Sequence, residues 1–192
     1  MIYVTSDLHF DHSNVIDYSD RPYEDEKNDQ GKIVPAVIAM NEGIVANYNA
    51  VVLPTDTIYI LGDIVFTKHA LQYLKRLNGH KFLISGNHDK SMMSKLRPYF
   101  EWTNNYYELK TINPLNQEDI NIVLFHYPIA SWNKAHLGSW HLHGHSHGKY
   151  VVDKGLIMDV GIDTNNMKPY SLVDVAKYMS TRERHTPDHN RE

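Results

Sequence analysis

The first half of the chain alternates short apolar runs with longer segments in which apolar residues recur at helical spacing. The runs have the length of buried strands and cover residues 2–6, 57–61 and 81–85. Helical spacing follows over 37–48, and again over 70–77. This order of strand, helix, strand, helix and strand predicts a sheet with parallel pairing and helices packed against it.

The second half is richer in strand-like runs, which predicts a second sheet packed on the first. A polar stretch over 7–34 predicts a long loop after the first strand, and long loops in compact domains are often functional. The whole is predicted to be an α/β sandwich with helices outside. The other predicted elements are strands over 101–112, 120–125 and near 139–143, 149–152 and 156–160, a short helix after Asp89 that ends before Pro98, and a last helix over 171–179.

The composition is typical of a globular domain. The chain has 192 residues, of which 42% are hydrophobic and 22% charged, enough to bury one core. We predict one domain over 1–180 and a polar tail over 181–192. No apolar stretch approaches the ~20 residues that span a bilayer, and the N-terminus lacks the pattern of a signal peptide, so no membrane partner is expected.

Charge and cysteine usage exclude several classes of function. The net charge of −4, without a cluster of Lys and Arg, disfavours tight binding to duplex nucleic acid. The absence of cysteine excludes disulfides, thiolate zinc sites and cysteine nucleophiles. It also fits a reducing compartment, so we expect a cytoplasmic protein.

The 13 histidines are the unusual feature of the composition, and several directly follow apolar strand-like runs. In open α/β sheets, ligands bind beyond the carboxyl ends of the strands, so distant residues at these ends are expected to meet along one rim. The potential metal ligands after such runs lie in Asp7-Leu8-His9, Gly62-Asp63, Gly86-Asn87-His88-Asp89, His126 and Gly144-His145-Ser146-His147.

Spacing and side-chain chemistry both favour a site with two cations. Asp7 and His9 are two apart, as are His145 and His147, and in an extended segment such pairs point to the same side. Imidazole, carboxylate and amide ligands together suit manganese, iron, zinc, nickel or cobalt, whereas magnesium prefers oxygen alone. About seven ligands are too many for one four-coordinate ion and predict a two-metal site.

Read in order, the motifs DLH, GD, GNHD, a later isolated histidine and GHSH resemble those of the calcineurin-like metallophosphoesterase superfamily, over residues 2 to about 163. The wider context is DLHFDHSNVI with RPY soon after, then FHYPIAS and HLHGHSHG. It is similar to a compact bacterial and phage subgroup of predicted phosphoesterases. The resemblance implies a four-layer α/β/β/α sandwich of two mixed sheets flanked by helices, with a dimetal site at one end of the sheets.

The resemblance also implies a role for each motif residue. Two divalent cations, manganese first with iron, zinc, nickel or cobalt as alternatives, would supply a hydroxide that attacks phosphorus. His88 would be the catalytic histidine beside the scissile phosphate, and Asp89 would orient it. The implied ligands are Asp7, His9 and His147 for the first ion, Asn87, His126 and His145 for the second, and Asp63 bridging both.

Residues near the motifs leave more than one interpretation open. His12 and Arg21 follow the first motif. Each of them either binds the substrate phosphate or packs the loop, and Arg21 would bind the phosphate through a bidentate fork. Trp132, Lys134 and His136 follow the isolated histidine, near the expected mouth of the site, and are weaker candidates for substrate contact.

Four further residues look like ligands by type. His141 and His143 extend the alternation in HLHGHSH, and spacing alone would allow them to bind metal. We expect core or supporting roles for both. Asp159 and Asp163 are expected to form turns, because no metal position remains for them.

The predicted function is hydrolysis of a phosphomonoester or phosphodiester, with a small phosphorylated or nucleotide-type substrate favoured over long nucleic acid. The alternatives are a nuclease or a protein phosphatase on the same metals, and a metal-stabilised binding module without turnover. A nuclease would need a basic groove beside the site. Intact His88 and Asp89 disfavour a scaffold without turnover. The sequence does not indicate the oligomeric state.

Overall fold

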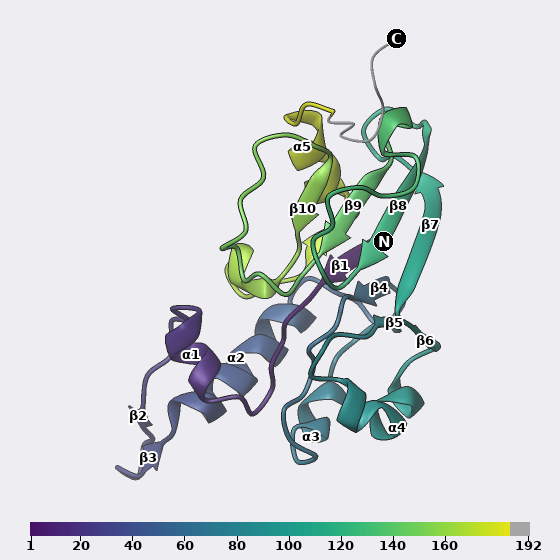
Figure 1. Ribbon diagram of the computed structural model, residues 1–192. Helices are drawn as coiled ribbons and strands as arrows, with labels where there is room; N and C mark the ends of the chain where they lie inside the picture. The colour runs from purple at the N-terminus through teal and green to yellow at the C-terminus, as the bar shows by residue number, and fades with distance from the viewer. Residues whose placement is uncertain (185–192) are drawn as a thin grey trace.

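A computed structural model describes residues 1–184, and most of its strands form two sheets (Figure 1). Of the predicted polar tail, residues 185–192 lie outside the described residues. The first sheet has the order β11 (Tyr170–Ser171), β1 (Ile2–Thr5), β4 (Thr57–Ile60), β5 (His80–Ile84) and β6 (Trp102–Asn104). The second has the order β10 (Ile157–Asp159), β9 (Trp140–His143), β8 (Asp119–Phe125) and β7 (Tyr106–Ile112).

The first sheet has the predicted parallel pairing. β1 pairs with β4, β4 with β5 and β5 with β6 in parallel, and only β11 joins the described part of this sheet antiparallel. The predicted helices connect these strands: α2 (Ala36–Asn49) precedes β4, and α3 (Leu71–Leu74) precedes β5. Because the strands are parallel, their carboxyl ends lie along one edge.

The second sheet is also mixed. β7 and β8 form an antiparallel hairpin, whereas β8 pairs with β9 and β9 with β10 in parallel. The chain between β8 and β9 must therefore return along the sheet before β9 begins. The structure confirms the predicted α/β fold class with two mixed sheets.

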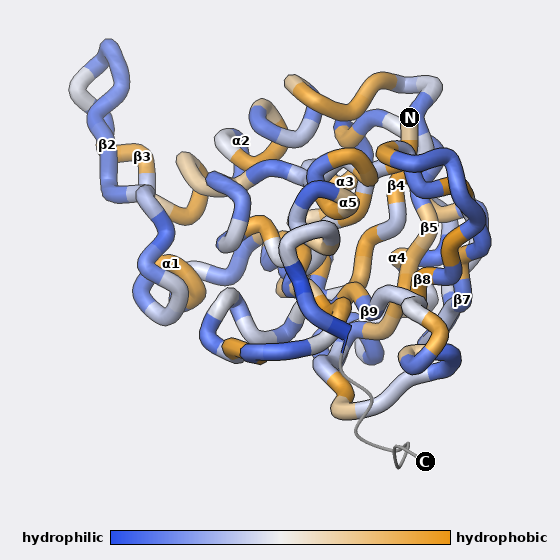
Figure 2. The backbone as a smooth tube through the Cα atoms, turned by 90° about the horizontal axis from the view of Figure 1, so that it is seen from above, coloured by the Kyte–Doolittle hydropathy of each residue, from blue (hydrophilic) through white to orange (hydrophobic). Residues whose placement is uncertain are grey.

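The apolar core lies on both faces of the first sheet. Figure 1 shows α2, α3 and α4 (Met93–Leu96) on one side of this sheet and the second sheet on the other. One cluster joins the helices to the sheet, and the other joins the two sheets and α5 (Leu172–Ser180). In Figure 2 hydrophobic residues follow the second half of β5, while the ribbon of β2 (Glu26–Lys27) and β3 (Ile33–Val34) projects from the body.

Three segments differ from the predicted elements. The run over 101–112 is divided, with its first part in one sheet and its second part in the other, so the chain crosses between sheets at Asn105. Residues 149–152 form no strand. Their apolar side chains do not pack in the core, and Val151 is 81% exposed. The stretch over 7–34 holds α1 (Asn14–Tyr18) and the β2–β3 ribbon.

Among residues 1–184, no helix combines the length and the apolar character needed to cross a membrane.

Leu142→Ala tests the packing between the two sheets. Leu142 is fully buried in the cluster that joins them, whereas Leu53 is 57% exposed and serves as the matched control. We expect Leu142→Ala to lower the free energy of unfolding by about 2–5 kcal/mol through the cavity it leaves. Leu53→Ala should change it by about 0.5 kcal/mol or less. Urea unfolding measures both, and equal losses would contradict the described packing.

Candidate metal centre

The potential ligands of the first sheet lie just beyond the ends of β1 and β4. Backbone pairing continues past the strands there, since the N–H groups of Asp7 and His9 donate to the carbonyls of Gly62 and Asp63 at 3.0 Å each. The two loops are therefore held side by side. Their side chains are brought to one edge of the sheet by the same hydrogen bonds that extend the ladder.

Two strands of the second sheet, β8 and β9, end next to these loops. The Gly144 N–H donates to the His126 carbonyl at 3.0 Å, which joins the ends of β9 and β8. The next residue, His145, donates its N–H to Asp7 Oδ2 at 2.9 Å and so connects the second sheet to the first. Residues separated by more than a hundred positions thus form one site.

Two groups of side chains are arranged to hold a cation. In each group, one ligand atom from each residue lies within 4.8 Å of the others. The groups are Asp7, His9 and His147, and Asp63, His126 and His145.

Asp63, a member of the second group, also lies close to the first. Its Oδ2 is 3.8 Å from His9 Nε2 in the first group and 3.6 Å from His126 Nε2 in the second. Asn87 Oδ1 lies 3.0 Å from the same nitrogen of His126. Asp63 Oδ2 is therefore within 4 Å of an imidazole nitrogen of each group, and Asn87 lies beside the second group.

The carboxylates of Asp7 and Asp63 each use one oxygen for the backbone and turn the other to the site. Asp7 Oδ2 accepts the His145 N–H, and Asp63 Oδ1 accepts the His88 N–H at 3.0 Å. Asp7 Oδ1 and His9 Nε2 are buried and find no hydrogen-bond partner among residues 1–184. A buried polar atom without a hydrogen-bond partner costs about 1–3 kcal/mol of stability. A bound cation would give both of these atoms a partner, so they fit the role of metal ligands.

Two glycines allow the carboxylates to come this close. A Cβ on Gly86 would lie 2.1 Å from Asp63 Oδ1, and a Cβ on Gly144 would lie 2.3 Å from Asp7 Oδ2. Both distances are far inside van der Waals contact. Any side chain at either position would displace the carboxylate that the site needs.

The backbone at five of the seven candidate ligands is left-handed, which departs from the extended geometry assumed for the DxH and HxH pairs. A positive φ costs a residue other than glycine roughly 1–2 kcal/mol, although Asp and His tolerate it better than most. Such costs persist where the surrounding structure fixes the conformation, and they gather at functional sites. The φ angles are 58° at Asp7, 51° at His9, 54° at Asp63, 70° at His145 and 48° at His147.

Neighbouring side chains and burial shift the pKa values of the candidate ligands. Burial alone would raise the pKa of Asp7, but the imidazoles of His9 and His147 hold it well below its usual range. Burial and the neighbouring His126 lower the pKa of His145. A deprotonated Asp7 and a neutral His145 are the forms that bind a cation.

Asp163 lies in the short 3-10 turn η4 (Ile162–Thr164), as expected for a turn residue, and its side chain also supports the site from behind. Its Oδ2 lies 2.7 Å from His147 Nδ1, and this bond leaves Nε2 of the ring directed at Asp7. Burial would lower the pKa of His147, but the bond to Asp163 raises it. No local motif marks Asp163, and only the fold brings it to His147.

Arg21 does not face the site opening, where a substrate phosphate would be. Its side chain is fully buried and donates to Asp163 Oδ1 and Oδ2 at 2.7 and 3.0 Å. It also donates to the carbonyls of Asp7 and Leu8 at 2.7 and 3.1 Å. The bidentate fork is therefore used on a carboxylate of the protein itself. Arg21 connects the first loop to Asp163.

Asp89 does not orient His88 through its carboxylate. It is fully buried, and its oxygens accept the N–H groups of Asp63, Ile64 and Gly86 at 2.8–3.0 Å. These contacts hold the GD and GNHD loops together, so the residue serves the architecture of the site. Burial raises the pKa of Asp89, and the three N–H bonds oppose that rise.

His88 and His12 lie beside the candidate ligands, and His88 is the more exposed of the two. The His88 side chain is 44% exposed, and its Nε2 lies 3.9 Å from Asp63 Oδ2. The His12 ring centroid is 5.3 Å from that of His9 and 6.2 Å from that of His88. Burial, aided by these two rings, lowers the pKa of His12 to about 4, so its ring is neutral at pH 7.

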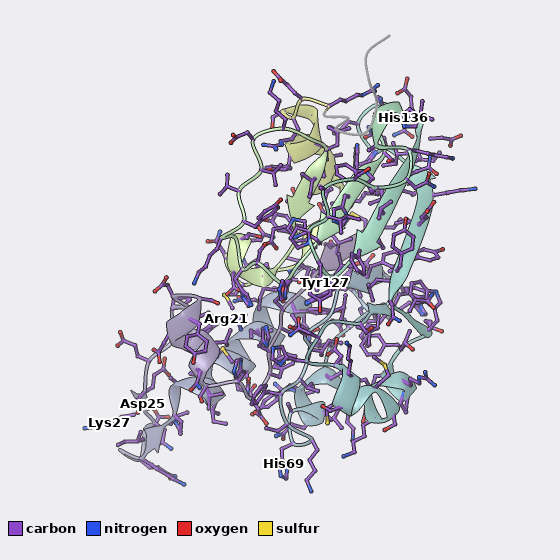
Figure 3. All side chains as sticks on the ribbon, in the orientation of Figure 1. Arg21, Asp25, Lys27, His69, Tyr127 and His136 are labelled. Carbon is purple, nitrogen blue, oxygen red and sulfur yellow. The ribbon has the colours of Figure 1, made fainter. Side chains whose placement is uncertain are left out.

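The weaker candidates lie elsewhere. His141 is buried between the carbonyls of Val123 and Tyr127, as expected for a core residue. Figure 3 shows Tyr127 in the middle of the molecule, next to the His126 end of β8, and His136 at the far end. The segment that carries His136 runs away from the site because β9 must begin at the opposite end of the sheet.

Asp163→Asn tests the support of His147. Removing the charge weakens the hydrogen bond that orients the ring, and such partners are typically worth about 10–100-fold in metal affinity. Isothermal titration with Mn²⁺ should show a loss of that size. Asp153→Asn, at an exposed position, should bind as the wild type does. Unchanged affinity in a folded Asp163→Asn protein, checked by circular dichroism, would show that Asp163 does not support the site.

Comparison with known proteins agrees with this geometry. A protein-family model described as calcineurin-like phosphoesterase matches residues 1–164. An uncharacterised protein of Methanocaldococcus jannaschii, MJ1445, is 31% identical over 186 residues, which cover 92% of this chain and 89% of that protein. The crystal structure of AQ665, a protein of unknown function from Aquifex aeolicus, superimposes with a TM-score of 0.63 at 24% identity, covering 93% of this chain and 98% of that one, and supports the fold. This chain belongs to the calcineurin-like phosphoesterase family.

Proposed function

We propose that the protein is a dinuclear-metal-dependent hydrolase of a phosphomonoester or phosphodiester, with a small or nucleotide-type substrate. The observation that carries the proposal is the position of Asp63 between two groups of metal donors, with the partly exposed ring of His88 beside it. Family membership gives the reaction class, and the donor arrangement fits it.

In this proposal seven side chains hold two cations of the manganese, iron, zinc, nickel or cobalt group, because their donors mix nitrogen with oxygen. When bound, such a pair lowers the pKa of water from about 15.7 toward about 7 and polarises the phosphoryl oxygens. The ligands are Asp7, His9 and His147 for one ion, Asn87, His126 and His145 for the other, and Asp63 for both.

His88 would act on the substrate directly. Its backbone N–H is fixed on Asp63 Oδ1 at 3.0 Å, while its ring is 44% exposed and free to meet a phosphate at the opening. From this position Nε2 can give a proton to the leaving oxygen. General acid catalysis of this kind is worth about 10²–10⁴-fold.

The charge of the chain favours a small substrate over a nucleic-acid strand. The chain has a net charge of −4, and its sequence holds no cluster of Lys and Arg. A nuclease would need a basic groove to follow a nucleic-acid backbone. Rapid degradation of long oligonucleotides would favour that alternative, and metal binding without turnover of any phosphate ester would favour a binding module.

His88→Ala tests the general acid. We expect turnover of an alkyl phosphate ester with added Mn²⁺ to fall about 10²–10⁴-fold, with metal content unchanged by elemental analysis. A p-nitrophenyl ester should lose less, because its leaving group needs little protonation. His69→Ala, which alters an exposed histidine far from the site (Figure 3), is the matched control and should keep full activity. Full activity of His88→Ala on the alkyl ester would contradict the role.

Asp63→Asn tests the shared ligand. An amide removes the negative charge that would face both ions, so we expect the purified variant to carry less metal than the wild type and to lose more activity than His88→Ala. Elemental analysis and Mn²⁺ titration measure the metal. Two metal ions bound at wild-type affinity would contradict the bridging position.

A further inference from the structure

Aromatic rings line one side of the proposed active site. The Phe66 ring stacks on His12 at a centroid distance of 4.2 Å and an interplanar angle of 20°, and its centroid is 6.0 Å from that of His88. Tyr18 adds an edge to the same group, 6.5 Å from His12. The group therefore begins at the residue proposed to protonate the leaving oxygen and extends outward from it.

Both outer rings are open to water. Phe66 is 49% exposed and Tyr18 is 62% exposed, whereas His12 is partly covered beneath them. A single exposed apolar residue needs no explanation by itself. Here the exposed rings adjoin a catalytic site and one of them already stacks on a third ring, which is the arrangement that binds a flat ligand.

The backbone holds Phe66 in this exposed position. Its N–H donates to the Phe10 carbonyl at 2.8 Å, and Val65 forms a parallel bridge with Phe10. The next residue, Thr67, donates its hydroxyl to Asp11 Oδ2 at 2.6 Å. The loop is thus fixed on both sides of the ring, so the ring is presented to solvent by a tied backbone and needs little ordering when a ligand stacks on it.

We infer that Phe66, supported by His12 and flanked by Tyr18, is a stacking platform for the base of a nucleotide whose phosphate lies at the metal centre. The inference rests on the proposed function and names its substrate class. Every nucleobase has a flat face that an aromatic side chain can cover, so the platform selects nucleotides as a class over sugar phosphates. One exposed phenyl face without a basic groove suits a single nucleotide better than a strand.

The test compares nucleotides with their base-free counterpart. Wild-type protein with Mn²⁺ is assayed on a panel of nucleoside monophosphates and cyclic nucleoside phosphates, and on ribose 5-phosphate. We expect higher kcat/KM for a nucleotide. Phe66→Leu keeps apolar bulk but lacks the aromatic face, and should lower the ratio of nucleotide to ribose phosphate kcat/KM about 5- to 150-fold, mainly through KM.

Two variants and one binding measurement complete the design. Phe66→Tyr keeps the flat face and should keep the ratio, as should Tyr178→Leu, which removes an aromatic residue 39% exposed on α5. Binding of the best nucleotide to Mn²⁺-loaded His88→Ala protein, measured by calorimetry, should weaken by the same factor when Phe66→Leu is added.

The outcomes separate the two proposals. If the wild type hydrolyses ribose phosphate as well as nucleotides, and Phe66→Leu leaves the ratio and the calorimetric affinity unchanged, the platform is wrong while the phosphoesterase stands. A preference for an aryl phosphate or a phosphotyrosine peptide over every nucleotide would likewise overturn it. If the wild type binds Mn²⁺ but hydrolyses no phosphate ester, the proposed function itself fails.

Discussion

The site depends on how two carboxylates divide their oxygens. Asp7 and Asp63 each give one oxygen to a backbone N–H of a distant loop and turn the other toward imidazole nitrogens. The first oxygen fixes the geometry and the second leaves a negative charge without a full set of partners. Burying a charged carboxylate costs free energy unless it is paired with a positive charge. The two aspartates that hold the loops together are therefore also the groups that a bound cation would stabilise.

The surrounding structure serves this division. Asp89 ties the loops after β4 and β5 through three backbone N–H groups, and Arg21 ties the loop after β1 to Asp163. Neither side chain is placed to meet a substrate. Together they keep strained, left-handed residues in position. The protein thus uses buried charge to preorganise the site, with the reactive groups left at its opening.

The opening shows a division of chemistry. On the metal side the donors are polar and largely buried, whereas the Phe66 side is aromatic and half-exposed. A substrate that joins an anionic group to a flat one would match both sides at once. The phosphate end would supply charge complementarity, and the flat end would supply contact area with little loss of conformational freedom.

The sequence by itself determined the parallel core and the residues that gather at its edge. Strand-length apolar runs followed directly by Asp, Asn or His predicted both, because in a parallel sheet the carboxyl ends share one edge. It also marked His88 as part of the GNHD motif, which lies at the opening.

Other features were decided by the tertiary structure. Asp163 looked like a turn residue only, and Arg21 could have bound phosphate or packed the loop, yet the fold pairs Arg21 with Asp163 and Asp163 with His147. Asp89 is adjacent to His88 in sequence, but its carboxylate accepts hydrogen bonds from backbone amides of the loop after β4. Local sequence records which groups a residue carries. Partners 16 to 142 positions away decide which of those groups are already satisfied, and only three-dimensional contact fixes those partners.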